Sequence, residues 1–281
     1  MLIEYLKAIV YGIVEGFTEW LPISSTGHLI LLERILSLDV GAGELSAQYR
    51  TLFDVVIQLG AILAVLVLYR KKLMPTTRSS RALWLRLALA TLPAAMIGLI
   101  ADALCESYLG VSLDTLLFTP YVVASALVVY GILFIVIERL TQNEPDTLTD
   151  VEKISYRRAF AIGCFQTLAL IPGTSRSGAT IIGARILKTS RGAAAEFSFF
   201  AAIPVICAAS ALKIFDFAKF TIETKTAIPP DMISLLLVAG AVAFLVSLVC
   251  IKFLTDFIKR HSFALFGAYR IALGLAVFIF L

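Results

Sequence analysis

The sequence predicts an all-α integral membrane protein that crosses the bilayer several times. Of its 281 residues, 59% are hydrophobic and only 16% are charged, and the mean hydropathy is +0.92. A soluble domain would carry about a quarter charged residues. Several apolar runs approach the roughly 20 residues that a helix needs to cross a bilayer, and the alternating pattern of a β-barrel is absent. Because lipid offers the backbone no hydrogen-bond partners, these runs are expected to be helices.

About six spanning helices are expected, and the basic loops set their orientation. The segment Arg70–Arg86 holds six Lys or Arg residues and no acidic residue, so the positive-inside rule places it in the cytoplasm. The linker 139–158 carries basic residues near its membrane ends and is placed on the same side. Both termini then face outside. The predicted spans are Leu52–Tyr69, Leu83–Ala103, Pro120–Ile137, Gly192–Ile214, Met232–Lys252 and Phe263–Leu281.

Two further apolar stretches are too short and too broken to span. Tyr5–Trp20 is followed by Pro22, a Ser/Thr/Gly turn and a second apolar piece that would cover roughly 16 Å as a helix, about half of a bilayer core. Ala159–Ile171 and Ala179–Leu187 repeat this arrangement around Pro172. Each pair predicts a re-entrant helical hairpin, whose irregular turn must be buried in protein or line a wet cavity. The charge count makes the hairpins enter from opposite sides and meet tip to tip.

The two halves of the chain resemble each other. LPISSTGHLILLERIL (Leu21–Leu36) matches IPGTSRSGATIIGARIL (Ile171–Leu187) with one inserted residue, and Phe53–Ala64 loosely resembles Phe197–Ala208. Copies of opposite orientation form an inverted-topology repeat, in which a site lies at the repeat interface. We therefore expect one membrane domain, 1–281, with repeat halves of approximately 1–138 and 159–281 joined by the cytoplasmic linker 139–158.

Glu15 and Glu19 predict a metal site in the first hairpin. They are four residues apart and share one face of a helix. Two carboxylates at lipid depth are costly unless they are paired, protonated or bound to a cation. Hard oxygen ligands of this kind suit Mg²⁺ or Ca²⁺. Structural pairing of each glutamate with an arginine is the alternative.

Both hairpin turns predict an anion site. Each is rich in hydroxyl and glycine residues and directly precedes a helix, so that two helix N-termini would direct free N–H groups at one place. Taken alone, Ser25 or Thr26 could be an ordinary N-cap. Arg176 adds a planar fork suited to bidentate phosphate binding. The predicted phosphate-binding residues are Ser24, Ser25, Thr26, Gly173, Thr174, Ser175, Arg176, Ser177, Gly178 and Thr180.

The predicted catalytic residues are Ser25, His28, Glu19 and Arg176. A single histidine in an apolar chain is usually structural, but His28 stands one turn from Ser25 and within reach of a bound anion. It could serve as general acid, general base or nucleophile. The site would combine carboxylates that bind a metal, donors that bind phosphate, a hydroxyl and an imidazole. This combination indicates metal-assisted phosphoryl transfer. The residues leave Ser25, His28 and an activated water open as the nucleophile.

These motifs resemble the undecaprenyl-diphosphatase family, also called the bacitracin-resistance proteins. EGFTEWLPISSTGH (Glu15–His28) and PGTSRSGAT (Pro172–Thr180) carry the resemblance, which covers essentially the whole chain and includes Tyr269 and Arg270 near its end. It implies a bacterial inner-membrane enzyme that converts undecaprenyl diphosphate to undecaprenyl phosphate and inorganic phosphate, recycling the lipid carrier for peptidoglycan. It also implies a divalent cation at Glu15 and Glu19, and a site open to the outer, periplasmic face.

The alternative function is a secondary transporter or lipid flippase. Inverted repeats with paired re-entrant hairpins are transporter architecture, and the fold does not decide between the two. Glu15 and Glu19 would then couple transport to protons or cations. The expected partners are the polyprenyl diphosphate substrate and membrane lipids, with a homodimer as a candidate assembly and no nucleic acid.

Overall fold

The computed structural model describes residues 2–40, 43–141 and 146–280, without the side chains of residues 259 and 260. These ranges form α-helices and short 3-10 turns with no named β-strand, which confirms the all-α class. The α-helices are α1 (Leu2–Thr18), α2 (Ser25–Ile35), α3 (Glu44–Leu68), α4 (Arg70–Leu73), α5 (Arg78–Leu109), α6 (Leu113–Leu117), α7 (Pro120–Thr141), α8 (Tyr156–Gln166), α9 (Arg176–Ile186), α10 (Arg191–Glu223), α11 (Pro230–Arg260) and α12 (Ala264–Phe280), and the 3-10 turns are η1 (Val151–Lys153) and η2 (Thr167–Leu170).

Within the described ranges, five helices are long and apolar enough to cross a membrane: α3, α5, α7, α10 and α11. These helices are longer than the predicted apolar runs, because each helix continues past its apolar residues into polar residues at the membrane surface. α3, for example, begins at Glu44 rather than Leu52. The sixth predicted span is the 17-residue α12. At 1.5 Å per residue α12 is about 25 Å long, somewhat short of the hydrocarbon core.

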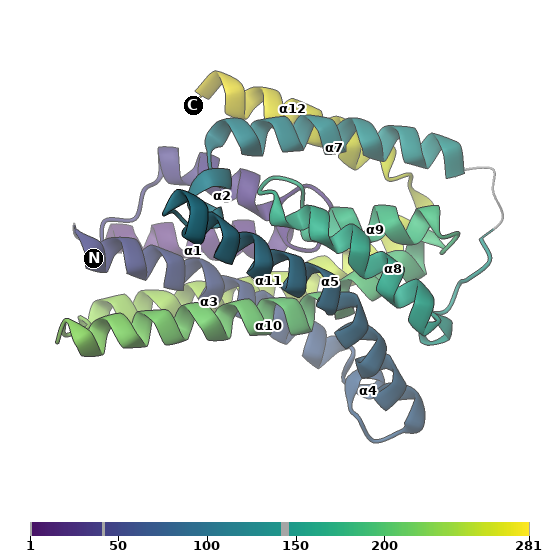
Figure 1. Cartoon of the computed structure of the whole chain (residues 1–281), viewed down its shortest axis with the longest axis horizontal. Coiled ribbons are helices and arrows are strands. Elements are labelled where there is room, and N and C mark those ends of the chain that lie inside the picture. The colour runs from purple at the N-terminus through teal and green to yellow at the C-terminus, as the bar shows by residue number, and fades with distance from the viewer. Residues whose placement is uncertain (1, 41–42, 142–145, 281) are drawn as a thin grey trace.

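The helices pack in pairs that cross between distant parts of the sequence. α7 and α12 lie side by side (Figure 1), α1 packs on α11, and α8 packs on α5. α3 contacts both α10 and α11. Gly60 allows the contact between α3 and α11, since a Cβ there would lie 2.2 Å from the carbonyl oxygen of Gly240. Small residues at such positions let transmembrane helices approach closely. The first helix of each hairpin is thus held by a helix from the other half of the chain.

The two segments predicted to be cytoplasmic lie at the same end of the molecule. Both described chain ends are at one side in Figure 1, and α4 lies at the other. The Oγ of Ser79 donates to Glu152 Oε2 at 2.7 Å, and Arg86 Nη1 donates to the Glu152 carbonyl at 2.9 Å. These bonds tie the Arg70–Arg86 segment to the linker. The arrangement agrees with the charge count, and the membrane face on which this end lies stays a prediction.

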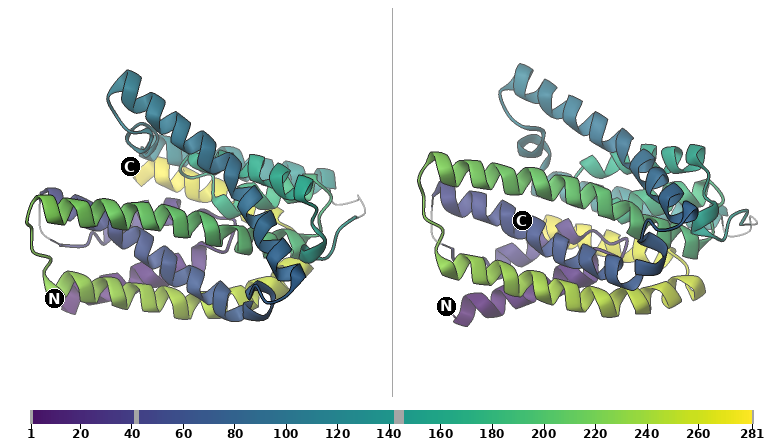
Figure 2. Two further views of the ribbon diagram at one scale, coloured as in Figure 1. Left: turned by 60° about the horizontal axis from the view of Figure 1, so that its bottom comes forward. Right: turned by 90° about the horizontal axis from the view of Figure 1, so that it is seen from below.

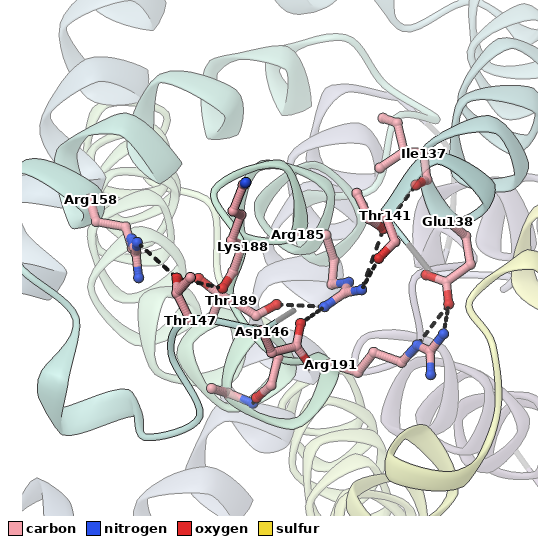
Figure 3. A network of polar contacts seen from close by, with 12 residues as sticks. Ile137, Glu138, Thr141, Asp146, Thr147, Arg158, Arg185, Lys188, Thr189 and Arg191 are labelled. Atoms are coloured by element: carbon pink, nitrogen blue, oxygen red, sulfur yellow. Dashed lines mark hydrogen bonds and ion pairs between the residues drawn. The ribbon is translucent and has the colours of Figure 1, made fainter. Parts of the chain in front are cut away.

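The linker docks on the end of α9 (Figure 3), a contact that the sequence did not reveal. Arg185 is buried, and its Nη1 donates to Asp146 Oδ1 at 2.6 Å and to the Thr189 carbonyl at 2.8 Å. The Thr147 N–H donates to the Lys188 carbonyl at 3.0 Å. Residues 142–145 of the linker lie outside the described ranges, and its last residues already belong to α8. The far end of the second hairpin is therefore anchored.

Labelling of single cysteines should locate the cytoplasmic end. Arg78 and Thr147 are both exposed there. In a background without the native cysteines, Arg78→Cys and Thr147→Cys should resist an impermeant thiol reagent in intact cells and react after lysis. Ser112→Cys, at the opposite end, is the control that should react without lysis, as the positive-inside rule predicts. Labelling at position 78 in intact cells would show that the predicted orientation in the membrane is inverted.

Candidate functional site

The turns of the two hairpins meet in the interior of the molecule. Arg176 Nη2 donates to Glu19 Oε1 at 3.0 Å, joining the start of α9 to the end of the first hairpin's leading helix. The hydroxyl of Ser177 also donates to the carbonyls of Glu19, at 3.4 Å, and Leu21, at 3.3 Å. The tip-to-tip contact expected from the charge count is therefore present.

Each turn ends in a serine N-cap with the same geometry. Ser24 has φ of 72°, and its Oγ accepts from the Gly27 N–H at 3.3 Å; Ser175 has φ of 70° and accepts from the Gly178 N–H at 3.1 Å. A positive φ is uncommon outside glycine, so these turns are held by their surroundings. The cap is Ser24 rather than Ser25 or Thr26. α2 and α9 therefore begin at Ser25 and Arg176, whose side chains take no part in capping.

A pocket of about 210 Å³ lies between the two turns. It collects most of the predicted residues and adds two glutamines, Gln58 of α3 and Gln166 of α8. Each glutamine interrupts an apolar stretch, and a polar group at membrane depth is by default a functional candidate, so the sequence did contain a signal for both. The predicted residues that line the pocket are Glu19, Ser24, Ser25, Thr26, Gly173, Ser175, Arg176 and Ser177.

Glu19 is the centre of the polar contacts. Its Oε2 accepts from the Ser25 hydroxyl at 2.9 Å, while its Oε1 accepts from Arg176. The other guanidinium nitrogen of Arg176, Nη1, donates to the Ser198 carbonyl of α10 at 2.8 Å. A hydroxyl that donates to a carboxylate oxygen has the geometry of a nucleophile with its base. The same carboxylate orients the cationic group beside it.

Glu15 lies behind Glu19 and is completely buried. No described N–H or O–H group outside the Glu15–Glu19 pair donates to its carboxylate oxygens, and the side chain interacts with the carboxyl group of Glu19 and with Arg176. A buried carboxylate without donors is costly, and a bound cation removes that cost. Among the described side chains, no group of three or more His, Cys, Asp or Glu residues is arranged to hold a metal ion by itself. Two carboxylates supplemented by substrate phosphates match the way Mg²⁺ is usually held.

Four other predicted residues do not line the pocket. His28 is turned toward α12: its Nδ1 lies 2.8 Å from the Ser24 carbonyl, and its Nε2 lies 2.7 Å from the Tyr269 hydroxyl. The ring lines a separate apolar pocket of about 500 Å³. Thr180 donates to the Ser198 hydroxyl at 2.8 Å, and Gly178 supplies the capping N–H. Thr174 is buried beneath the second turn.

Arg270 of α12 holds the two turns together. It is completely buried, and it donates to the Pro22 carbonyl at 3.2 Å and to the Gly173 carbonyl at 2.8 Å. Its guanidinium also lies over the Phe134 ring, 5.8 Å from the centroid. In the sequence, Arg270 is marked only by the family resemblance. An arginine inside an apolar C-terminal helix was the available signal.

A second, larger cavity, here called the vestibule, adjoins the pocket. This cavity of about 730 Å³ shares Thr26 and Gln58 with the pocket. Its walls are mixed, with apolar residues such as Leu29 and Phe118 beside the charged residues Glu33, Asp54 and Lys213. The vestibule is therefore a candidate route for water and small ions to the pocket.

The fold and the site together define a polytopic membrane protein with an interior polar pocket built from two hairpin turns. The paired hydroxyl and carboxylate beside a forked cation suit phosphate chemistry. The chain belongs to the family described as bacitracin resistance protein BacA, whose family model matches residues 8–276.

Curated relatives match along the whole chain. An undecaprenyl-diphosphatase of Lactococcus lactis subsp. cremoris (strain SK11) is 45% identical over 99% of this chain and 97% of its own length. Proteins of the same name from Streptococcus thermophilus and Acetivibrio thermocellus are each 46% identical over 99% of this chain, and over 94% and 98% of their own lengths.

Proposed function

We propose that this protein is an integral membrane phosphatase that hydrolyses undecaprenyl diphosphate to undecaprenyl phosphate and inorganic phosphate. Full-length relatives carry the name of this activity. The observation that carries the proposal within the chain is the contact of Ser25 and Arg176 with one carboxylate, Glu19, at the meeting point of two helix N-termini. The reaction regenerates the lipid carrier used in peptidoglycan synthesis.

In the proposed reaction Arg176 and the first N–H groups of α2 and α9 bind the terminal phosphate. Charge-assisted and N-terminal donors of this kind favour phosphate. The Ser25 hydroxyl attacks the terminal phosphorus and transfers its proton to Glu19. A serine–phosphorus bond forms, the anhydride bond breaks, and undecaprenyl phosphate leaves. Water from the vestibule then hydrolyses the phosphoserine, releasing inorganic phosphate and restoring the hydroxyl.

We propose that Glu15 and Glu19 hold a divalent cation, Mg²⁺ or Ca²⁺. The burial of the two neighbouring carboxyl groups, with no described donor outside the pair directed at the Glu15 oxygens, supports this assignment. Such a cation neutralises charge on the phosphate oxygens. We further propose that the protein lies in the bacterial inner membrane and that its vestibule opens to the outer face, in keeping with the basic residues of the Arg70–Arg86 segment at the opposite end.

The metal proposal predicts that chelator abolishes phosphate release and that added Mg²⁺ or Ca²⁺ restores it. Glu15→Gln keeps the size of the side chain but removes its charge, so it should abolish metal-dependent activity in a protein that still inserts and purifies. Glu33→Gln is the matched control, because Glu33 is exposed in the vestibule and pairs with Arg50. Full activity of Glu15→Gln in excess chelator would remove the metal from the mechanism.

Phosphate release by purified protein tests the function itself. The protein in detergent, supplied with undecaprenyl diphosphate and a divalent cation, should release phosphate with turnover, and Ser25→Ala should not. A transporter or flippase without hydrolytic activity would release none under the same conditions.

A further inference from the structure

One wall of the phosphate pocket is apolar. Besides Glu19 and Arg176, the pocket is lined by Ala94 of α5, Leu170 of η2, and Val205 and Ala209 of α10. Ala209 is exposed. A phosphate group gains nothing from such a wall. The wall is therefore suited to another part of the ligand.

The pocket is too small for a complete lipid. Its volume of about 210 Å³ lies below the roughly 300–1,000 Å³ of pockets that enclose a drug-sized ligand. It can take a diphosphate and the first carbons of a chain. The rest of a polyprenyl chain must leave the pocket for the hydrocarbon of the bilayer.

The vestibule is a poor route for that chain. Its lining mixes apolar residues such as Leu29 and Phe118 with four acidic residues and one lysine, namely Glu33, Asp54, Asp114, Asp216 and Lys213. Laying hydrocarbon against the charged residues would remove water from the charges without replacing their hydrogen bonds. The vestibule instead suits inorganic phosphate and water.

α5 and α10 diverge next to the apolar wall. Both views of Figure 2 show them close together near α4 and apart toward their other ends. Each helix has an internal proline directly before a wall residue, Pro93 before Ala94 and Pro204 before Val205. A proline inside a helix removes one backbone hydrogen bond and commonly kinks the helix. Only 17% of the most apolar stretch of α5 is buried, so this helix is directed mainly toward lipid.

We infer that α5 and α10 form a lateral doorway through which the polyprenyl chain of the substrate passes from the phosphate pocket into the bilayer. Ala94, Val205 and Ala209 contact the first isoprene units, and Leu170 of η2, which packs against α5 at Gly98, forms the edge of the doorway. The inference rests on the proposed function and adds a separate route for each part of the reaction. The lipid chain passes between α5 and α10, and inorganic phosphate leaves through the vestibule.

A second apolar pocket is the rival route. It has a volume of about 500 Å³ and is lined by Ile13 and Phe17 of α1 and by Leu265 and Tyr269 of α12. It shares no lining residue with the phosphate pocket. The first turn lies between them, with Leu21 and Ile23 on one side and Ser24 and Ser25 on the other. A chain attached to phosphate at Ser25 would have to cross that turn.

Substitution at the doorway should change chain selectivity. Ala209→Trp narrows the doorway for a long chain. We therefore expect kcat/KM for undecaprenyl diphosphate to fall by about tenfold or more relative to kcat/KM for dimethylallyl diphosphate, which has a single isoprene unit. Apolar pockets discriminate between substrates on this scale. Ala208→Trp is the matched control, because Ala208 is exposed beside Ala209 but does not line the pocket. An unchanged ratio in a well-folded Ala209→Trp protein would overturn the doorway.

Photolabelling of the unaltered protein gives an independent answer if the tryptophan variant does not fold. A polyprenyl diphosphate carrying a photoreactive group on its first isoprene unit should label peptides of α5 and α10. Labelling of α1 and α12 instead would place the chain in the rival pocket and overturn the inference. Failure of the proposed function is distinguishable, because the unaltered protein would then release phosphate from neither substrate.

Discussion

Arg176→Ala is expected to lower phosphate release by roughly 10²–10³-fold, the usual cost of removing a charged donor aimed at a transferring phosphoryl group. Arg176→Lys should not restore activity, because it keeps the charge but loses the fork that contacts both Glu19 and Ser198. Arg34→Ala is the control: Arg34 is exposed on α2, and its loss should change the rate by no more than about twofold. The measurement is steady-state phosphate release by purified protein.

A double-mutant cycle tests whether the two hairpins build one site. Glu19 and Arg176 are 157 residues apart in sequence and 3.0 Å apart in space. Residues that act as one unit are strongly non-additive. Glu19→Gln combined with Arg176→Ala should therefore be little worse than the poorer single variant. If the two losses simply multiply, the residues act independently and the shared site is wrong.

Ser25→Ala is expected to reduce turnover by roughly 10³-fold or more, because it removes the proposed nucleophile. His28→Ala should reduce turnover far less, since the His28 ring is hydrogen-bonded to Ser24 and Tyr269 outside the pocket. Ser37→Ala, at an exposed position beyond α2, is the control. Rapid quenching followed by mass spectrometry should find phosphate on Ser25. Phosphate on His28, or equal losses in the two variants, would exclude Ser25 as the nucleophile.

Much of the fold was predictable because membrane segments obey simple constraints. Apolar length identified the spans, and the basic segments indicated which loops share an end. The same charge count required the turns at Pro22 and Pro172 to approach each other. Most residues of the pocket followed from that step, because they lie within two short contiguous motifs whose N-caps orient them.

The remaining features depend on contacts between distant segments. Arg270 reaches the carbonyls of Pro22 and Gly173, and no periodicity or spacing marks such a pair. His28 was placed in the site by its spacing from Ser25, but a hydrogen bond to Tyr269 turns its ring toward α12. The docking of the linker on Arg185 likewise needs three-dimensional coordinates. Local pattern identifies candidate groups, whereas long-range hydrogen bonds decide where their side chains point.

The two matched N-caps have a consequence for how such a site can evolve. Ser24 and Ser175 stabilise their turns, while the next residue in each chain segment, Ser25 or Arg176, supplies the chemistry. Stability and reactivity are thus assigned to neighbouring but different side chains. After duplication of one ancestral hairpin, mutation at the position following each cap could give one copy a hydroxyl and the other a cation while both turns were preserved. Two identical halves could in this way diverge into complementary parts of a single catalyst.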